Sequence, residues 1–264
     1  MNRIVEQGWL AVADSAKTDI SPCYDNRPYI AQMGLWRNLD ANKLEKVIAY
    51  SDIFGFPLSK MIIVIILMIV IGLIIPLNLL PYLLKGEKLK GVPWLYFFTI
   101  GMAFMIVEII LIQKYALFIG SSVYSISTVL LTLLLASGLG SRLSQKLPGG
   151  LVFVMITFWL LLDIFVFNNI ANGLIHLSLV PRMLMTTAFI FPLGFFMGMP
   201  FPKAAVRVGA LVDWGFAVNG AAAVLGSAAI MLIVFAFGFQ IALLVATVLY
   251  LLAWFLFTRK SSWS

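Results

Sequence analysis

The chain has 264 residues, of which 62% are hydrophobic and 11% charged, and its mean hydropathy is +1.04. Soluble domains carry about 25% charged and about 45–50% apolar residues, so a water-soluble fold could not bury this much apolar surface. The net charge of +7 comes from Lys and Arg residues that sit mostly in the first 60 positions and in short loops, as membrane proteins place them. These totals argue against a soluble nucleic-acid-binding protein and make the lipid bilayer the expected partner.

Residues 1–60 form a mixed polar segment, and the composition changes sharply at Lys60. Within the segment, Asn42 to Phe54 place their apolar residues on one helical face. This predicts a short amphipathic helix on the membrane surface, with an ordinary surface helix as the alternative. Sixty residues of this composition are expected to be the end of a soluble domain and not a whole one. Cys23 is the single cysteine of the chain, which excludes an intramolecular disulfide and a CxxC site.

Apolar runs long enough for membrane helices, which need about 20 residues each, follow Lys60. We therefore predict an all-α fold, a polytopic transmembrane bundle over residues 61–257, with a short basic tail at 258–264. Only Gly238-Phe239-Gln240 separates the last two runs, which predicts a tight helical hairpin. The expected spans are 61–84, 92–113, 122–140, 151–170, 183–199, 216–237 and 240–257.

The charges of the loops predict the orientation of these spans. Lys and Arg are concentrated after the first, third, fifth and seventh spans, whereas the alternate loops hold only Lys114 and Arg182. Both ends of spans two to seven, and with them the C-terminus, are therefore expected on the cytoplasmic side. Either residues 1–60, with seven Lys or Arg, then lie outside, or residues 61–84 do not cross fully. The sequence leaves both possibilities open.

Polar residues inside the expected spans form a candidate intramembrane site. An acidic residue at the centre of a membrane helix costs about 2.5–3.5 kcal/mol on insertion scales. Such a residue has either a proton- or substrate-binding role or a structural hydrogen bond that fixes helix packing. Asp163 lies near the end of its span, so it could also have a role at the membrane interface. The candidate residues are Glu108, Gln113, Asp163 and Asn219.

Small residues recur at helical spacing in several of the spans. Within a lipid environment such residues let helix backbones approach closely, and Asn219 could form a hydrogen bond across the interface. The predicted helix-packing set is Gly101, Ala136, Gly140, Gly194, Gly198, Ala223, Gly226 and Ser227.

Signatures of soluble catalysis are missing from the sequence. It has no Ser/His/Asp set, the glycines around Gly138 do not complete a phosphate-binding loop, and His176 is the sole histidine. We therefore expect no catalytic, cofactor-binding or metal-binding residues in this chain.

Several segments, taken in order, are similar to one known family. They are Gly101 to Glu108, Gly138 to Ser141, Met197 to Pro202 and Asn219-Gly220-Ala221. Together they resemble the carboxyl-terminal membrane region of bacterial spermidine synthase-like multi-pass proteins. In that family an aminopropyltransferase-like domain of the Rossmann type is joined to membrane helices. Asp25-Asn26-Arg27-Pro28-Tyr29 resembles the stretch where the soluble domain ends, with Asn26 in place of the second acidic residue.

The resemblance implies a membrane-embedded half in a bacterial inner membrane that lacks the catalytic domain. It would anchor or regulate a soluble aminopropyltransferase-like domain or subunit, and the chain is not expected to be an enzyme by itself. The alternative is a transporter or channel subunit for a small molecule, with a polyamine as one candidate. Spans two to seven also loosely resemble a six-helix half of a major-facilitator transporter, with the first span as an extra helix.

Overall fold

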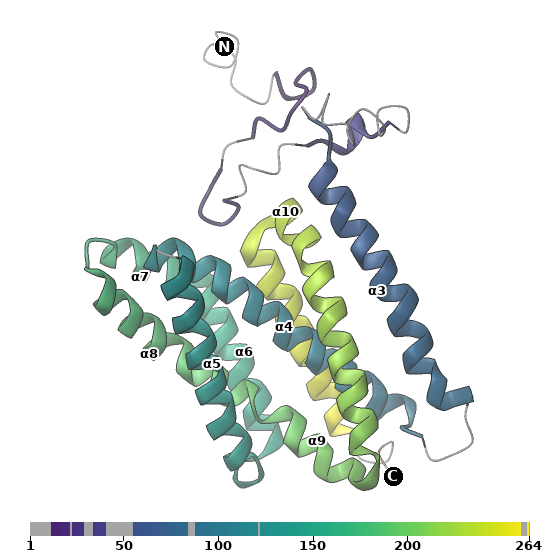
Figure 1. Cartoon of the computed structure of the whole chain (residues 1–264). Helices are drawn as coiled ribbons and strands as arrows, with labels where there is room; N and C mark the ends of the chain where they lie inside the picture. Colours follow the sequence, from purple (N-terminus) through teal and green to yellow (C-terminus); the bar gives the residue numbers. More distant parts are fainter. Residues whose placement is uncertain are drawn as a thin grey trace.

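The computed structural model describes residues 12–21, 23–28, 34–40, 55–83, 88–120, 122–259 and 263. In this part of the chain the regular structure is helical, apart from one isolated bridge between Tyr24 and Arg27. The predicted all-α helical bundle is therefore confirmed (Figure 1). The amphipathic helix predicted from Asn42 to Phe54 lies outside the described residues.

The helices follow the apolar runs of the sequence. In chain order they are η1 (Trp36–Asn38), α3 (Leu58–Leu83), α4 (Gly91–Ile119), α5 (Ser122–Leu143), η2 (Ser144–Lys146), α6 (Gly149–Phe165), α7 (Phe167–Leu174), α8 (Leu179–Met197), α9 (Pro200–Val208), η3 (Gly209–Leu211) and α10 (Val212–Thr258).

Several of these helices are long and apolar enough to cross a membrane. Among the described residues, length and composition identify Gly91–Ile119, Val123–Lys146 and the stretch Leu179–Thr258. The pair α6 and α7 adds a fourth candidate if the two helices, bent by 49° at Val166, count as one span. The chain therefore has the helices of a membrane protein, while the count of seven crossings stays a prediction.

The helices differ from the sequence-based expectation at several positions, and Arg182, which was expected in a loop, lies inside α8. The expected second span ended at 113, but α4 continues to Ile119 and carries Lys114 inside the helix, not in a loop. Lys114 is long enough to find a polar partner without leaving the helix, so the charge does not end it. The expected fourth span is not straight, because it divides at Val166 into α6 and α7.

The predicted hairpin is present within α10. Gly238 has φ 84° and ψ −177°, and the helix is broken there. This conformation is accessible to glycine because it has no Cβ. Figure 1 shows that the chain turns back at this point, so that α10 consists of a first arm before Gly238 and a second arm after it.

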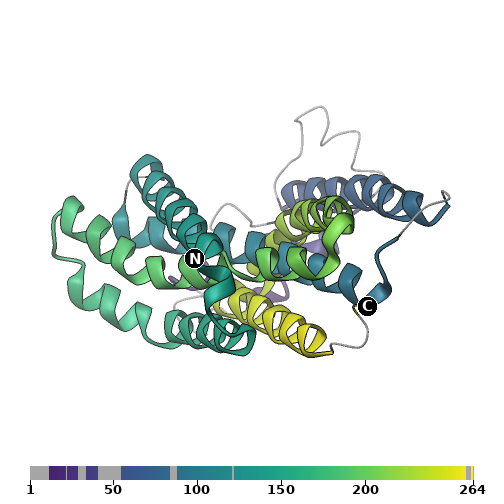
Figure 2. The same cartoon turned by 90° about the horizontal axis from the view of Figure 1, so that it is seen from below.

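The buried core lies mainly between α4 and α10. Tyr96, Tyr115 and Tyr250 are among the largest fully buried side chains. A second group is formed by α5 and α8, while α6 contacts both α8 and α10, and α3 packs along α10. Seen from below (Figure 2), α3 and the first arm of α10 lie on one side of the molecule, and α5 and α8 lie on the other.

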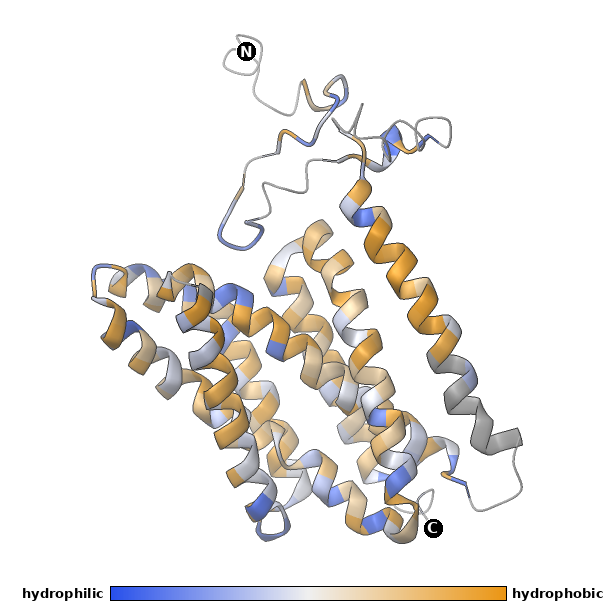
Figure 3. Cartoon of the chain, in the orientation of Figure 1, coloured by the Kyte–Doolittle hydropathy of each residue, from blue (hydrophilic) through white to orange (hydrophobic). Residues whose placement is uncertain are grey.

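The outer surface of the bundle is apolar. Large hydrophobic side chains such as Met68 on α3 and Leu134 on α5 are exposed, as expected where lipid is the solvent. Figure 3 shows hydrophobic residues along the middle of the helices and hydrophilic residues at the lower ends of α5 and α9. The described N-terminal residues lie at the opposite, upper end of the bundle (Figure 1).

Candidate functional site

A groove of about 650 Å³ lies where α4, α5, α8, α9 and α10 meet. Small-molecule sites typically enclose about 300–1,000 Å³, with apolar walls and a few polar groups. The walls here are mostly apolar, and the polar side chains are those of Ser137, Ser141, Asn219 and Tyr250. None of the described residues that line the groove is charged.

Glycines bring the helices together around this groove. A Cβ at Gly101 would overlap the carbonyl oxygen of Asn219, and one at Gly198 would overlap that of Ser137. A Cβ at Gly140 would likewise overlap the carbonyl oxygen of Phe195. The backbones of α4 and α10, and of α5 and α8, are therefore close enough to touch at positions where any side chain would force them apart.

The other residues predicted to pack helices together differ in what they contact. A Cβ at Gly194 would lie 3.1 Å from the Cβ of Ala136, and Gly226 faces Met102 of α4. Ala223 lines the groove. Ser227 donates a hydrogen bond to the carbonyl of Val224 in its own helix at 2.8 Å, so its hydroxyl serves α10 itself.

A buried ion pair joins α4 to α6. The Nζ atom of Lys114 lies 2.7 Å from Oδ2 of Asp163 and donates a second hydrogen bond, of 2.8 Å, to the Asp163 carbonyl oxygen. The Tyr115 hydroxyl donates to Oδ1 of Asp163 at 2.7 Å. The exposed fractions of the Lys114 and Asp163 side chains are 5% and 1%. Asp163 is thus held in the protein interior with every carboxylate oxygen partnered.

The position of Asp163 explains why its carbonyl needs a partner from outside the helix. The last four carbonyl groups of an α-helix have no intrahelical partner, and Asp163 lies in the final turn of α6, just before the bend at Val166. Lys114 supplies the missing hydrogen bond. The ammonium group also lies 4.9 Å from the ring centroid of Phe167, the first residue of α7. The cluster therefore fixes the bend between the two helices.

The remaining polar candidates do not join this cluster. Glu108 is half-buried on α4 and makes no hydrogen bond or ion pair with the described residues. The Nε2 atom of Gln113 donates to the sulfur of Met231 at 3.4 Å, and Asn219 lines the groove. The structure thus places Glu108, Gln113, Asp163 and Asn219 in different surroundings.

The N-terminal segment is attached to the break in α10. At a helix break such as Gly238, the first N–H groups of the second arm and the last carbonyls of the first arm have no partner within their own arm. Asn26 accepts hydrogen bonds from the N–H of Phe239, through its carbonyl oxygen, and from the N–H of Gln240, through Oδ1, each at 2.9 Å. The Nε atom of Arg27 donates to the carbonyl of Phe235 at 2.8 Å.

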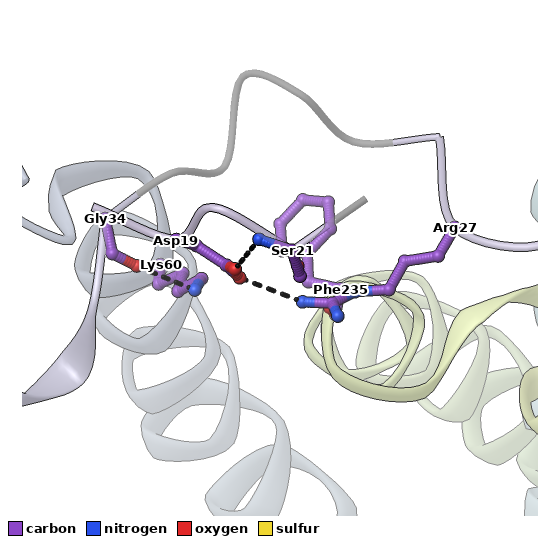
Figure 4. Close-up of polar contacts among 6 residues, drawn as sticks. All are labelled: Asp19, Ser21, Arg27, Gly34, Lys60 and Phe235. Carbon is purple, nitrogen blue, oxygen red and sulfur yellow. Dashed lines mark hydrogen bonds and ion pairs between the residues drawn. The ribbon is translucent and has the colours of Figure 1, made fainter. Parts of the chain in front are cut away.

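Asp19 and Ser21 complete this attachment (Figure 4). Arg27 Nη2 lies 3.2 Å from Oδ2 of Asp19, and the Ser21 N–H donates to Oδ1 of Asp19 at 2.9 Å. Burial alone would raise the pKa of Asp19, but the hydrogen bonds from Ser21 and the charges of Arg27 and Lys60 outweigh it and hold the pKa below its ordinary value of 3.8. We call Asp19, Ser21, Asn26 and Arg27 the N-terminal clamp.

The structure shows contacts for several residues that the sequence alone does not indicate. The charge of Lys114 predicts a loop, but the apolar run continues past it to Ile119 and Lys114 lies inside α4. The role of Asn26 could have been suspected from the hairpin at Gly238, because a helix break needs polar caps. His176 is exposed between α7 and α8, and the described residues contain no group of three potential metal ligands.

Comparison with protein-family models, with curated proteins and with solved structures finds no match for this chain. The groove, the buried cluster and the N-terminal clamp are therefore the features that bear on its function.

Proposed function

We propose that this chain is the membrane-embedded unit of a spermidine synthase-like protein and that it anchors a soluble catalytic partner. The observation that supports the proposal is the N-terminal clamp, which ties Asn26 and Arg27 to both arms of α10. Two residues of the clamp, Asn26 and Arg27, lie in the stretch whose sequence resembles the end of that family's soluble domain. A domain or subunit held by this stretch would be connected directly to a membrane helix pair.

We further propose that the bundle crosses the membrane seven times, with α3 as the helix added to a six-helix, major-facilitator-like unit. The support is that each expected span lies largely within one helix, one arm of α10 or the α6–α7 pair, and that α3 extends along α10 (Figure 1). The six-helix unit would then comprise α4, α5, the bent pair α6–α7, α8 and the two arms of α10. The basic loops and the C-terminus would face the cytoplasm of a bacterial inner membrane, and the clamp would face the other side.

Cys23 provides a direct test of this orientation because it is the single cysteine and is exposed. A membrane-impermeant maleimide should label it in intact spheroplasts, and pretreatment from outside should prevent later labelling in inverted vesicles. Labelling only after inversion would place the clamp in the cytoplasm and overturn the seven-crossing proposal. A Cys23→Ser variant gives the background.

Photo-crosslinking tests the anchoring role. A photoreactive amino acid at Tyr24, which is exposed beside the clamp, should crosslink to a soluble protein that mass spectrometry identifies as aminopropyltransferase-like. The same amino acid at the exposed Leu184 of α8 should crosslink to lipid only. An Arg27→Ala change should weaken the Tyr24 crosslink. If Tyr24 crosslinks only to lipid in correctly inserted protein, the anchoring proposal is wrong.

The second candidate is a small-molecule transporter or channel subunit, and Glu108 favours it. A half-buried carboxylate on an apolar helix, without a partner among the described residues, is expected to face a pathway or a substrate. A Glu108→Gln change should then abolish uptake of a labelled polyamine at unchanged protein levels. If uptake falls only in proportion to the amount of folded protein, Glu108 has a structural role.

A further inference from the structure

The groove between α4, α5 and α10 contains polar groups that the protein leaves without partners. Tyr250 is 1% exposed, and it lines the groove from the second arm of α10. Neither its hydroxyl nor the side-chain amide of Asn219 makes a hydrogen bond with the described residues. A polar group in an apolar environment without a hydrogen bond is costly, so these two groups indicate a ligand or water between the helices.

The charge of the groove limits what it can hold. Its described lining contains no carboxylate and no cation, so an ion entering it would lose its hydration without gaining a counter-charge. The neighbouring cations of α9 are already engaged outside the groove. Lys203 Nζ donates to the Leu147 carbonyl, and Arg207 donates to the Phe257 carbonyl while stacking 3.4 Å from the centroid of the Phe257 ring. The groove therefore suits an uncharged molecule.

The groove is open toward the apolar outside of the bundle. Leu134 and Phe216 line it and are also exposed on the surface that hydrophobic residues cover. A molecule dissolved in the bilayer could enter sideways between α5 and the first arm of α10. Its apolar part would contact residues such as Phe104 and Met105.

We propose that the groove is a binding site for a neutral, membrane-dissolved amphiphile with an apolar chain and one hydroxyl or carbonyl oxygen. That oxygen bonds to the hydroxyl of Tyr250 and the amide of Asn219, which together offer donors and acceptors. The proposal goes beyond the anchoring function and does not depend on it. The Tyr24 crosslinking experiment can fail without affecting this site.

Four photoreactive probes of equal chain length test the proposal: a long-chain alcohol, the corresponding carboxylic acid, the amine and the alkane. Each carries a diazirine and is added to the purified full chain in lipid nanodiscs, and labelled peptides are mapped by mass spectrometry. The alcohol should label groove peptides of α4, α5 and α10 more strongly than the other three probes. A Tyr250→Phe change keeps the ring and removes one hydrogen bond, so alcohol labelling should fall roughly two- to tenfold, while alkane labelling stays unchanged.

Two glycines provide a matched pair of variants. A Cβ at Gly138 or at Gly220 meets no atom within 4 Å, but only Gly138 lines the groove. A Gly138→Leu change should fill the groove and abolish alcohol labelling, whereas Gly220→Leu should leave it unchanged. Equal labelling by all four probes, or an equal loss of alcohol and alkane labelling in Tyr250→Phe, would show that the groove is only ordinary lipid-facing surface and would overturn the proposal.

Discussion

Two acid–base pairs with the same chemical parts lie in contrasting regions of the molecule. In each pair a carboxylate binds a cation that also donates a hydrogen bond to a backbone carbonyl at a helix end. The exposed fractions are 5% and 1% for Lys114 and Asp163, but 34% and 23% for Arg27 and Asp19. The first pair fixes the bend between α6 and α7, and the second attaches the N-terminal segment to Phe235 of α10.

The difference between the pairs lies in what replaces a lost partner. Water can solvate an exposed charge, so exposed ion pairs contribute about 0–1 kcal/mol. A charge inside the bundle has no such substitute, and removing its partner costs about 3–5 kcal/mol. We infer that the Lys114–Asp163 pair stabilises the position of α6, which packs on α8 and α10, relative to α4, whereas the N-terminal clamp can open without unfolding the bundle.

Breaking the buried pair should have the largest effect. Asp163→Asn leaves the Lys114 ammonium buried without a carboxylate, and we expect a loss of about 3–5 kcal/mol in the free energy of unfolding. Asp19→Asn, the matched change in the clamp, should cost about 0–1 kcal/mol. Both values can be measured from unfolding of the detergent-solubilised protein in SDS.

A double variant shows whether the charge itself causes the loss. Lys114→Met together with Asp163→Leu removes both charges and should recover most of the stability lost in Asp163→Asn, because apolar pairs can replace buried ion pairs. If the double variant is as unstable as Asp163→Asn, the cluster is needed for its hydrogen bonds at the bend and the electrostatic explanation is wrong.

Removing a single hydrogen bond from the same cluster should have an intermediate effect. Tyr115→Phe deletes the donor to Oδ1 of Asp163 while keeping the ring against Phe167. Hydrogen bonds to charged groups contribute about 1.5–3 kcal/mol, and a loss in this range is expected from the same SDS titration. Tyr124→Phe, at an exposed position of α5, is the control and should leave the stability unchanged. No loss in Tyr115→Phe would mean that Lys114 alone stabilises Asp163.

The helices could be predicted from the sequence because each apolar run needs lipid or another helix along its whole length. The Gly238 hairpin was predictable for a related reason, since two long runs meet at a glycine. The close approach of Gly101 to Asn219 was expected only as a general tendency of small residues to pack. Periodicity identifies the face of a helix but not the helix that it meets.

The site residues were less predictable because their partners are distant in the sequence. Lys114 and Asp163 are 49 positions apart, and a lysine after an apolar run has the same pattern whether it ends a span or lies buried inside one. Asn26 and Gln240 are 214 positions apart. The position of Tyr250 in the groove could not be predicted, because the sequence shows only an aromatic residue in an apolar helix.

Removing the Asn26 cap from the second arm of α10 should have a smaller effect, because it weakens the exposed N-terminal clamp and not the buried cluster. Asn26→Ala removes the acceptor for the Gln240 N–H but leaves the backbone bond from Phe239. Loss of a helix N-cap costs about 0.5–2 kcal/mol, and hydrogen exchange at Gln240 should become faster by a corresponding factor. Asp25→Ala, an exposed neighbour, is the control. Unchanged exchange in Asn26→Ala would show that the backbone bond alone holds the clamp.

The smallest expected effect is a pH dependence of the N-terminal clamp. Because the folded pKa of Asp19 is lower than its ordinary value of 3.8, the stabilisation from its ionised form is complete above that value and is lost as the pH falls through the folded pKa. A spin label on Cys23, four positions from Asp19, should therefore become more mobile only below about pH 4. In Asp19→Asn the label should already be mobile at neutral pH and unresponsive to acid. If the two regions are independent, the Lys114–Asp163 cluster should stay intact while the clamp opens. Simultaneous loss of both would show that the two regions are coupled.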